Sequence, residues 1–175
     1  MKTMIIVNDG CEECEALIVY DLLYRAGLDV KLVGFNKNTV SSHNVTFEAH
    51  ELLDDIDPEE YECLVLPGGL PGTTHLKEDQ RVSYLIDKFV KDDKYVCAIC
   101  AAPSILIEKG LLQNEKFVCF PGFECGMTPS GDKAVQDKKF ITGKGLGAAF
   151  EFGALIIKNL ISEEKADEIL KKIQY

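Results

Sequence analysis

The alternation of short apolar runs with amphipathic segments is the feature that most constrains how this chain can fold. Residues 4–7 and 64–66 are continuous apolar runs, which are typical of strands buried on both faces. Segments 12–25 and 80–91 instead repeat apolar residues at helical spacing. Strands that alternate with helices predict βαβ units, and βαβ units imply a mostly parallel central sheet with helices on both faces.

The same patterns place the remaining elements. We expect further strands over residues 30–35, 95–99, 116–120 and 139–142, and two short strands within 39–48. We expect further helices over 102–109, 150–160 and 163–173, with Ser162 as an N-cap and with Gly27 and Gly110 ending helices. No repeat, linker or low-complexity tract interrupts the chain, so residues 1–175 are predicted to form a single domain.

The charge balance disfavours two classes of partner. The chain has 29 acidic and 19 basic residues and a formal net charge of -10. An acidic surface repels phosphate backbones and anionic lipid surfaces, so we expect neither nucleic acid nor membrane as a partner. No stretch approaches the roughly 20 apolar residues of a spanning helix, and the N-terminus does not resemble a signal peptide. A cytoplasmic location is therefore expected.

The seven cysteines do not indicate a disulfide framework, because their number is odd and a cytoplasmic compartment is reducing. Two Cys-x-x-Cys pairs have the spacing of zinc ligands, but Cys97 falls inside a predicted buried strand. The three histidines have no ligand spacing. We therefore expect no metal and no cofactor. The seven cysteines are Cys11, Cys14, Cys63, Cys97, Cys100, Cys119 and Cys125.

Cys100 has the most informative local context. It follows a predicted strand and precedes small residues and Pro103, which can open a helix. This is the layout of a nucleophile elbow, in which a tight turn exposes the nucleophile above the sheet. Backbone amides at the helix start favour the thiolate form of such a cysteine. The alternative is a buried apolar cysteine at a strand end.

Two further segments follow strands and should meet Cys100 at the same edge of the sheet. Gly68 and Gly69 could direct backbone amides at an oxyanion, although an ordinary Pro-Gly turn has the same sequence. Glu15 lies in the first predicted helix. A carboxylate beside a thiolate raises the pKa of both groups, so we expect Glu15 to share one proton with Cys100, acting as a protonated donor to sulfur. Glu12 and Glu13 are expected only to complement the helix dipole.

These residues occur within a series of motifs that runs nearly the length of the chain and resembles the ThiJ/PfpI superfamily. The motifs are 10–15 (GCEECE), 25–27 (RAG), 66–69 (LPGG), 98–103 (AICAAP), 143–147 (GKGLG) and 150–152 (FEF). The resemblance is nearest to the YajL-like branch, which is related to the Parkinsonism-associated protein deglycase. It implies a flavodoxin-like sandwich with a nucleophile elbow, and a homodimer.

The resemblance also implies roles for particular residues. Cys100 would be the nucleophile or oxidisable thiol and Glu15 its protonated partner. Gly69 and Ala101 would supply amides to an oxyanion. Arg25 would lie near the dimer interface and the site, and His43 would reach the site of the neighbouring subunit. Protease-like branches carry a histidine where this chain has Phe120, so peptidase activity is not expected.

Two functions follow from a reactive Cys100. The resemblance implies a glyoxalase or deglycase that acts on a small 2-oxoaldehyde or its glycated adduct. The alternative is a redox-sensing oxidative-stress protein or chaperone that uses Cys100 oxidation, with Cys14 as a resolving thiol. The resemblance also carries a label of thiazole monophosphate biosynthesis, which no residue here supports.

Overall fold

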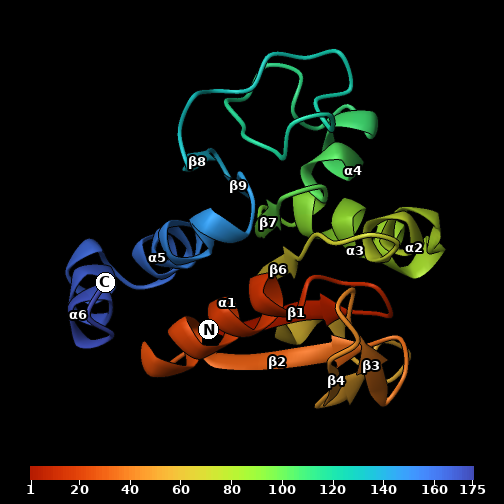
Figure 1. The fold of residues 1–175 in the computed structure, drawn as a ribbon, viewed down its shortest axis with the longest axis horizontal. Helices are drawn as coiled ribbons and strands as arrows, with labels where there is room; N and C mark the ends of the chain where they lie inside the picture. Colours follow the sequence, from red (N-terminus) through yellow and green to blue (C-terminus); the bar gives the residue numbers. More distant parts are fainter.

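The structure is a computed structural model that describes residues 1–175, and its centre is a seven-stranded sheet (Figure 1). The strands lie in the order β5 (Glu51–Leu52), β2 (Asp29–Gly34), β1 (Lys2–Val7), β6 (Cys63–Leu66), β7 (Tyr95–Ile99), β9 (Phe140–Gly143) and β8 (Ala134–Asp137). All neighbouring strands are parallel except β8, which pairs antiparallel with β9. The carboxyl ends of β1, β6 and β7 therefore meet at one edge.

Helices cover both faces of the sheet and bury two apolar cores. One core includes residues of α1 (Glu13–Arg25), α5 (Ala149–Leu160) and α6 (Glu163–Lys172). The other includes residues of α2 (Gly72–Glu78), α3 (Gln80–Lys91) and α4 (Pro103–Glu108). Figure 1 shows these two groups of helices on opposite sides of the central strands. The side chains of β1 alternate between the cores, with Ile5 in the first and Met4 and Ile6 in the second.

Smaller elements complete the chain. A hairpin of β3 (Asn38–Val40) and β4 (Thr46–Glu48) lies outside the central sheet, and two 3-10 turns are η1 (Pro58–Glu60) and η2 (Leu146–Ala148). Ser162 caps α6 by accepting a hydrogen bond from the Lys165 N–H at 3.2 Å, as expected. Gly27 has φ +87 directly after the C-cap of α1, a conformation that a side chain would disfavour.

The expected flavodoxin-like α/β class is confirmed, and one expected strand is wrong. Residues 116–120 form no strand. Side chains satisfy part of this segment's backbone instead: the Val118 N–H donates to Thr142 Oγ1 at 2.9 Å and the Lys116 N–H to Asp137 Oδ2 at 2.8 Å. Strand β8 pairs with the free edge of β9. The sequence analysis did not predict β8, α2 or β5. No helix has the length and apolar character needed to cross a bilayer.

Candidate active site

Cys100 lies at the turn between β7 and α4, where β7 ends at the sheet edge. Its φ is +65, an unusual left-handed conformation for a residue with a side chain. The turn is fixed from both sides, because the Cys100 N–H donates to the Gly143 carbonyl at 2.9 Å and the Phe120 N–H donates to the Cys100 carbonyl at 2.8 Å. Cys100 is half-buried, and it lines an open cavity of about 320 Å³.

Glu15 meets Cys100 from the first turn of α1. Its side chain is buried, with only 1% of the residue exposed, and it hydrogen-bonds with the Cys100 thiol. Glu15 Oε2 also accepts a hydrogen bond from the Gly68 N–H at 2.9 Å. The Gly68 amide therefore positions Glu15 and is not free to bind an oxyanion, which corrects the expectation for Gly68.

The absence of a side chain at residue 68 is necessary for this contact. A Cβ at Gly68 would lie 2.6 Å from Cys100 Cβ and 2.7 Å from Glu15 Oε2. Gly69 has φ +90 and has even less room, because a Cβ there would lie 2.3 Å from the Glu12 nitrogen. The two glycines therefore let three chain segments meet around the sulfur.

The pKa values of both members of the pair are raised. Burial, followed by the charge of Glu15, raises the pKa of Cys100 to about 12, although the amides of Ala101 and Gly69 lower it in part. Burial raises the pKa of Glu15 to about 7, although the hydrogen bonds with Cys100 and Gly68 lower it in part. The sequence reading expected both pKa values to rise, but the lowered thiol pKa expected from helix-start amides is not found, because desolvation and the neighbouring carboxylate outweigh them.

The pair consequently loses its first proton near pH 7 and keeps only one proton between pH about 7 and about 12. The sulfur becomes a thiolate only while Glu15 holds that proton, and loss of the second proton requires pH near 12. The Glu15 carboxylate is therefore a base in direct contact with the Cys100 thiol. The amides of Ala101 and Gly69 hydrogen-bond with the sulfur, and their expected role at an oxyanion stays a prediction.

The wall of the Cys100 cavity includes groups that sequence reasoning did not assign to the site. Glu12, Ser42 and Leu70 line it, together with Phe123. Glu12 was expected only to complement the helix dipole, yet it caps α1 and accepts a hydrogen bond from Ser42 Oγ at 3.3 Å. The position of Glu12 after β1 could have indicated a place in the site, because ligands bind beyond the carboxyl ends of strands.

His43 lies at the rim of the cavity of its own chain. Its Nδ1 is 3.1 Å from Glu13 Oε1 and 3.3 Å from Glu12 Oε2. These three residues form a group that could hold a cation, but their contacts are already satisfied by one another and by Ser42. The expected reach of His43 into a neighbouring subunit stays a prediction.

Arg25 and Cys14 do not line the Cys100 cavity. Arg25 ends α1, about 15 Å along the helix axis from Glu15, and its Nε binds Asp21 Oδ2 at 2.6 Å. Cys14 is half-buried, and its role as a resolving thiol stays a prediction. The zinc-like cysteine spacing does not produce a cluster, because the sulfur of Cys97 contacts Cys63 Sγ at 3.5 Å inside the core.

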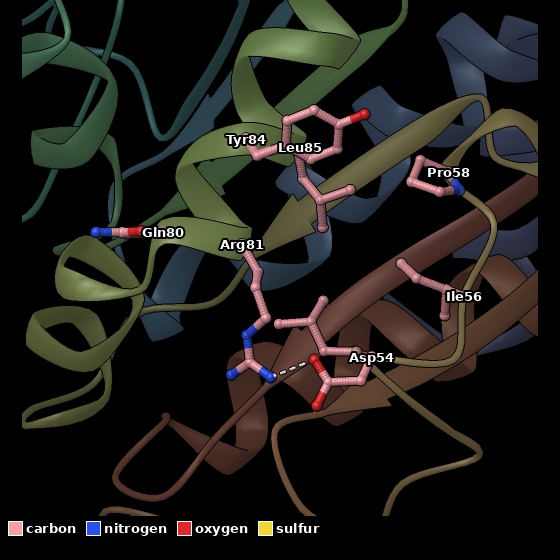
Figure 2. A pocket seen from close by; sticks show the side chains of 8 residues that line it. Asp54, Ile56, Pro58, Gln80, Arg81, Tyr84 and Leu85 are labelled. Atoms are coloured by element: carbon pink, nitrogen blue, oxygen red, sulfur yellow. Dashed lines mark hydrogen bonds and ion pairs between the residues drawn. The ribbon is translucent and has the colours of Figure 1, made fainter.

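A larger cavity of about 430 Å³ lies elsewhere, between α3 and the loop after β5 (Figure 2). Figure 2 shows that Arg81 points toward Asp54 across its opening, and Asp79 also binds this guanidinium. Its lining includes no cysteine or histidine and its cation is already paired. The smaller cavity at Cys100 is therefore the candidate active site.

Comparison with known proteins identifies the family of the chain. Residues 1–159 match the model of the DJ-1/PfpI family. Protein DJ-1 homolog B of Arabidopsis thaliana is 32% identical over 96% of this chain, and the chain spans about 40% of the length of that relative. Glutathione-independent glyoxalase DJR-1.2 of Caenorhabditis elegans is 30% identical over 97% of this chain and 94% of its own. Deglycase PH1704 of Pyrococcus horikoshii is 29% identical over 82% of this chain and 86% of its own.

Among solved structures, oxidized Toxoplasma gondii DJ-1 superposes with a TM-score of 0.95 at 29% identity. The superposition covers 99% of this chain and 98% of the other.

Proposed function

The chain belongs to the DJ-1/PfpI family, and we propose that it is a cysteine-dependent glyoxalase or deglycase that acts on small 2-oxoaldehydes or their adducts. The observation that carries the proposal is the half-exposed Cys100 sulfur in hydrogen-bond contact with the buried Glu15 carboxyl. The relatives named glyoxalase and deglycase support the same class of reaction.

The first step is addition of the Cys100 sulfur to the aldehyde carbon. A carbon–sulfur bond forms, the carbonyl electron pair moves to oxygen, and the thiol proton passes through Glu15 to that oxygen. The product is a hemithioacetal. The amides of Ala101 and Gly69 stabilise the negative charge on the oxygen as it develops.

The second step moves hydrogen between the two carbons. Glu15 takes the proton from the carbon that carries sulfur and returns it to the neighbouring carbon, which converts the hemithioacetal of methylglyoxal into a lactate thioester. Water then cleaves the carbon–sulfur bond and releases lactate and the thiol. The overall reaction adds one water to methylglyoxal and needs no external oxidant, reductant or cofactor.

Replacement of Cys100 tests this function directly. A Cys100→Ser variant should lose lactate production from methylglyoxal, because a hydroxyl beside a carboxylate of pKa about 7 is a far weaker nucleophile. A Cys125→Ser variant is the control, since Cys125 is exposed and lies outside the cavity at Cys100. Full lactate production by the Cys100 variant, measured enzymatically, would exclude the proposal.

A peroxide-sensing role is a second candidate, supported by the same half-exposed sulfur. It would convert Cys100 to a sulfenic acid and then to a sulfinic acid or a disulfide with Cys14. Mass spectrometry after peroxide treatment checks this role. A stable sulfinate without a Cys14–Cys100 linkage would exclude Cys14 as the resolving thiol.

We further propose a single cytoplasmic domain that forms homodimers. An aromatic patch on α1 supports the dimer: Tyr20 stacks on Tyr24 with ring centroids 6.0 Å apart and on His50 at 5.4 Å. Tyr24 is 64% exposed. Arg25 follows this patch directly, so a dimer formed through the patch would place Arg25 near the interface.

A further inference from the structure

The last step of the proposed reaction is hydrolysis of the thioester on Cys100, and it needs a base that takes a proton from water. Glu15 is poorly placed for this task, because it is 1% exposed and its carboxyl contacts the sulfur and the Gly68 N–H. Glu12 instead lines the open cavity in which the thioester would lie. We propose that Glu12 is the general base that activates the hydrolytic water, an inference that rests on the proposed function.

The backbone of Glu12 is fixed beside the Cys100 cavity. Its N–H donates to the Gly68 carbonyl at 2.9 Å, and a Cβ at Gly69 would lie 2.3 Å from the Glu12 nitrogen. The start of α1 is therefore packed directly against the loop that follows β6. A catalytic base must be held in place before the reaction, and this backbone contact meets that need.

The side chain of Glu12 lies at the wall of the same cavity. Its Oε2 accepts a hydrogen bond from Ser42 Oγ at 3.3 Å and lies 3.3 Å from His43 Nδ1. Ser42 and His43 both line the Cys100 cavity, so the carboxylate that they contact lies beside it. The charge of Glu12 also contributes to the raised pKa of Glu15, which agrees with a position near the Glu15–Cys100 pair.

The Glu12 carboxylate still has the capacity to bind a water molecule. Its contacts with Ser42 Oγ, His43 Nδ1 and the Cys14 N–H measure 3.3, 3.3 and 3.4 Å. Hydrogen bonds of these kinds are usually about 2.7–3.0 Å long, so none of the three is tight. An ionised carboxylate accepts about four hydrogen bonds, and this side chain is 12% exposed. A water molecule in the cavity can therefore bind this carboxylate at a normal distance.

The two carboxyl groups beside Cys100 then divide the proton transfers. Glu15 exchanges protons with the carbons of the substrate, and Glu12 acts on water from the open side. In the hydrolytic step, Glu12 takes a proton from water while the water oxygen bonds to the thioester carbonyl carbon. The carbon–sulfur bond then breaks with its electron pair on sulfur, and the proton passes from Glu12 to that sulfur. Lactic acid and the Cys100 thiol are the products, and no other reactant is consumed.

Replacement of Glu12 by glutamine tests this assignment, since glutamine keeps the shape of the side chain and removes the base. In Glu12→Gln, kcat for lactate formation from methylglyoxal should fall about hundredfold, as loss of a general base implies. KM should fall in parallel and kcat/KM should change little, because the thioester forms before water reacts.

The thioester should consequently accumulate in Glu12→Gln to a higher level than in the parent protein. Intact-protein mass spectrometry should show it as an increase by the mass of one methylglyoxal. Hydroxylamine should release it as lactohydroxamate, a product that a hemithioacetal does not give. Hydroxylamine in the assay should also raise the turnover of the variant, because it cleaves a thioester without a base and needs only a folded site.

Glu13→Gln is the matched control. The Glu13 side chain is also 12% exposed and its Oε1 lies 3.1 Å from the same His43 Nδ1, but Glu13 does not line the cavity. This variant should keep the parent kcat and should accumulate no additional thioester.

An unchanged kcat in Glu12→Gln would overturn the inference. A lower kcat without accumulated thioester and without rescue by hydroxylamine would also overturn it, as would equal accumulation in Glu12→Gln and Glu13→Gln. A parent protein that makes no lactate from methylglyoxal would instead contradict the proposed function.

Discussion

At the scale of single residues, the site depends on two unfavourable local states. Cys100 adopts φ +65, which costs an L-residue about 1–2 kcal/mol. Glu15 is a buried carboxyl whose charge is stabilised by the Cys100 thiol and by a single backbone amide, that of Gly68. Both states are maintained by neighbouring segments, and the proposed function uses them to hold a base against a nucleophile.

Replacing Glu15 should therefore stabilise the protein. Burial raises the pKa of Glu15 from 4.5 to about 7, so the folded protein binds this proton more tightly than the unfolded chain does. Stability is then lost as pH rises from about 4.5 through about 7, by about 3 kcal/mol in total. Glu15→Gln should recover much of this at pH 8 and little at pH 4.5, as measured by urea unfolding.

Glu168→Gln provides the control of opposite sign. Lys165 and Lys172 lower the pKa of the half-buried Glu168 to about 2, so its removal should give a small loss of stability at pH 8. If Glu15→Gln were also destabilising at pH 8, the raised pKa of Glu15 would be contradicted.

At the scale of elements, the sequence predicts the regular helices and strands, but it does not predict the conformation of residues 116–120, whose backbone binds side chains. Helix α3 and strand β7 have the expected bounds, because apolar spacing reports which face is buried. Residues 116–120 have the apolar composition of a strand and are partly buried, but a side chain of β9 satisfies the Val118 N–H. Composition does not distinguish a ladder partner from a side-chain partner, so this segment was assigned wrongly.

Thr142 should be the residue that holds this segment in place. Its Oγ1 accepts the buried Val118 N–H, and Thr142→Val keeps the shape of the side chain but leaves that donor unsatisfied. The free energy of unfolding should fall by about 1–3 kcal/mol. Hydrogen exchange of the Val118 amide should become faster by a matching amount. Thr142→Ser retains the acceptor and should behave like the parent protein; equal losses in both variants would show that the hydrogen bond is unimportant.

At the scale of the whole molecule, the sheet topology explains why residues distant in sequence meet. Glu15, Gly68 and Cys100 follow β1, β6 and β7, which are neighbouring parallel strands. The sequence could therefore predict that they share an edge. It could not predict that the Gly68 amide would bind Glu15, or that Ser42 and Phe123 would complete the cavity, because loop geometry decides those contacts.

The proposed dimer is tested at the same scale. Tyr24→Glu places a charge in the aromatic patch of α1 and should shift the protein toward monomer in sedimentation velocity. Tyr84→Glu is a matched control, since Tyr84 is 61% exposed on α3, away from that patch. A dimer that survives Tyr24→Glu but is lost in Tyr84→Glu would place the interface on the other side of the sheet.

The pH dependence of Cys100 alkylation tests most directly whether Cys100 and Glu15 share one proton. In the parent protein the rate should rise through pH about 7, where the pair loses its first proton, and then stay level to at least pH 9. In Glu15→Gln the step near pH 7 should vanish and the rate should keep rising with pH, as for a single thiol. Identical profiles for the two proteins would contradict the account.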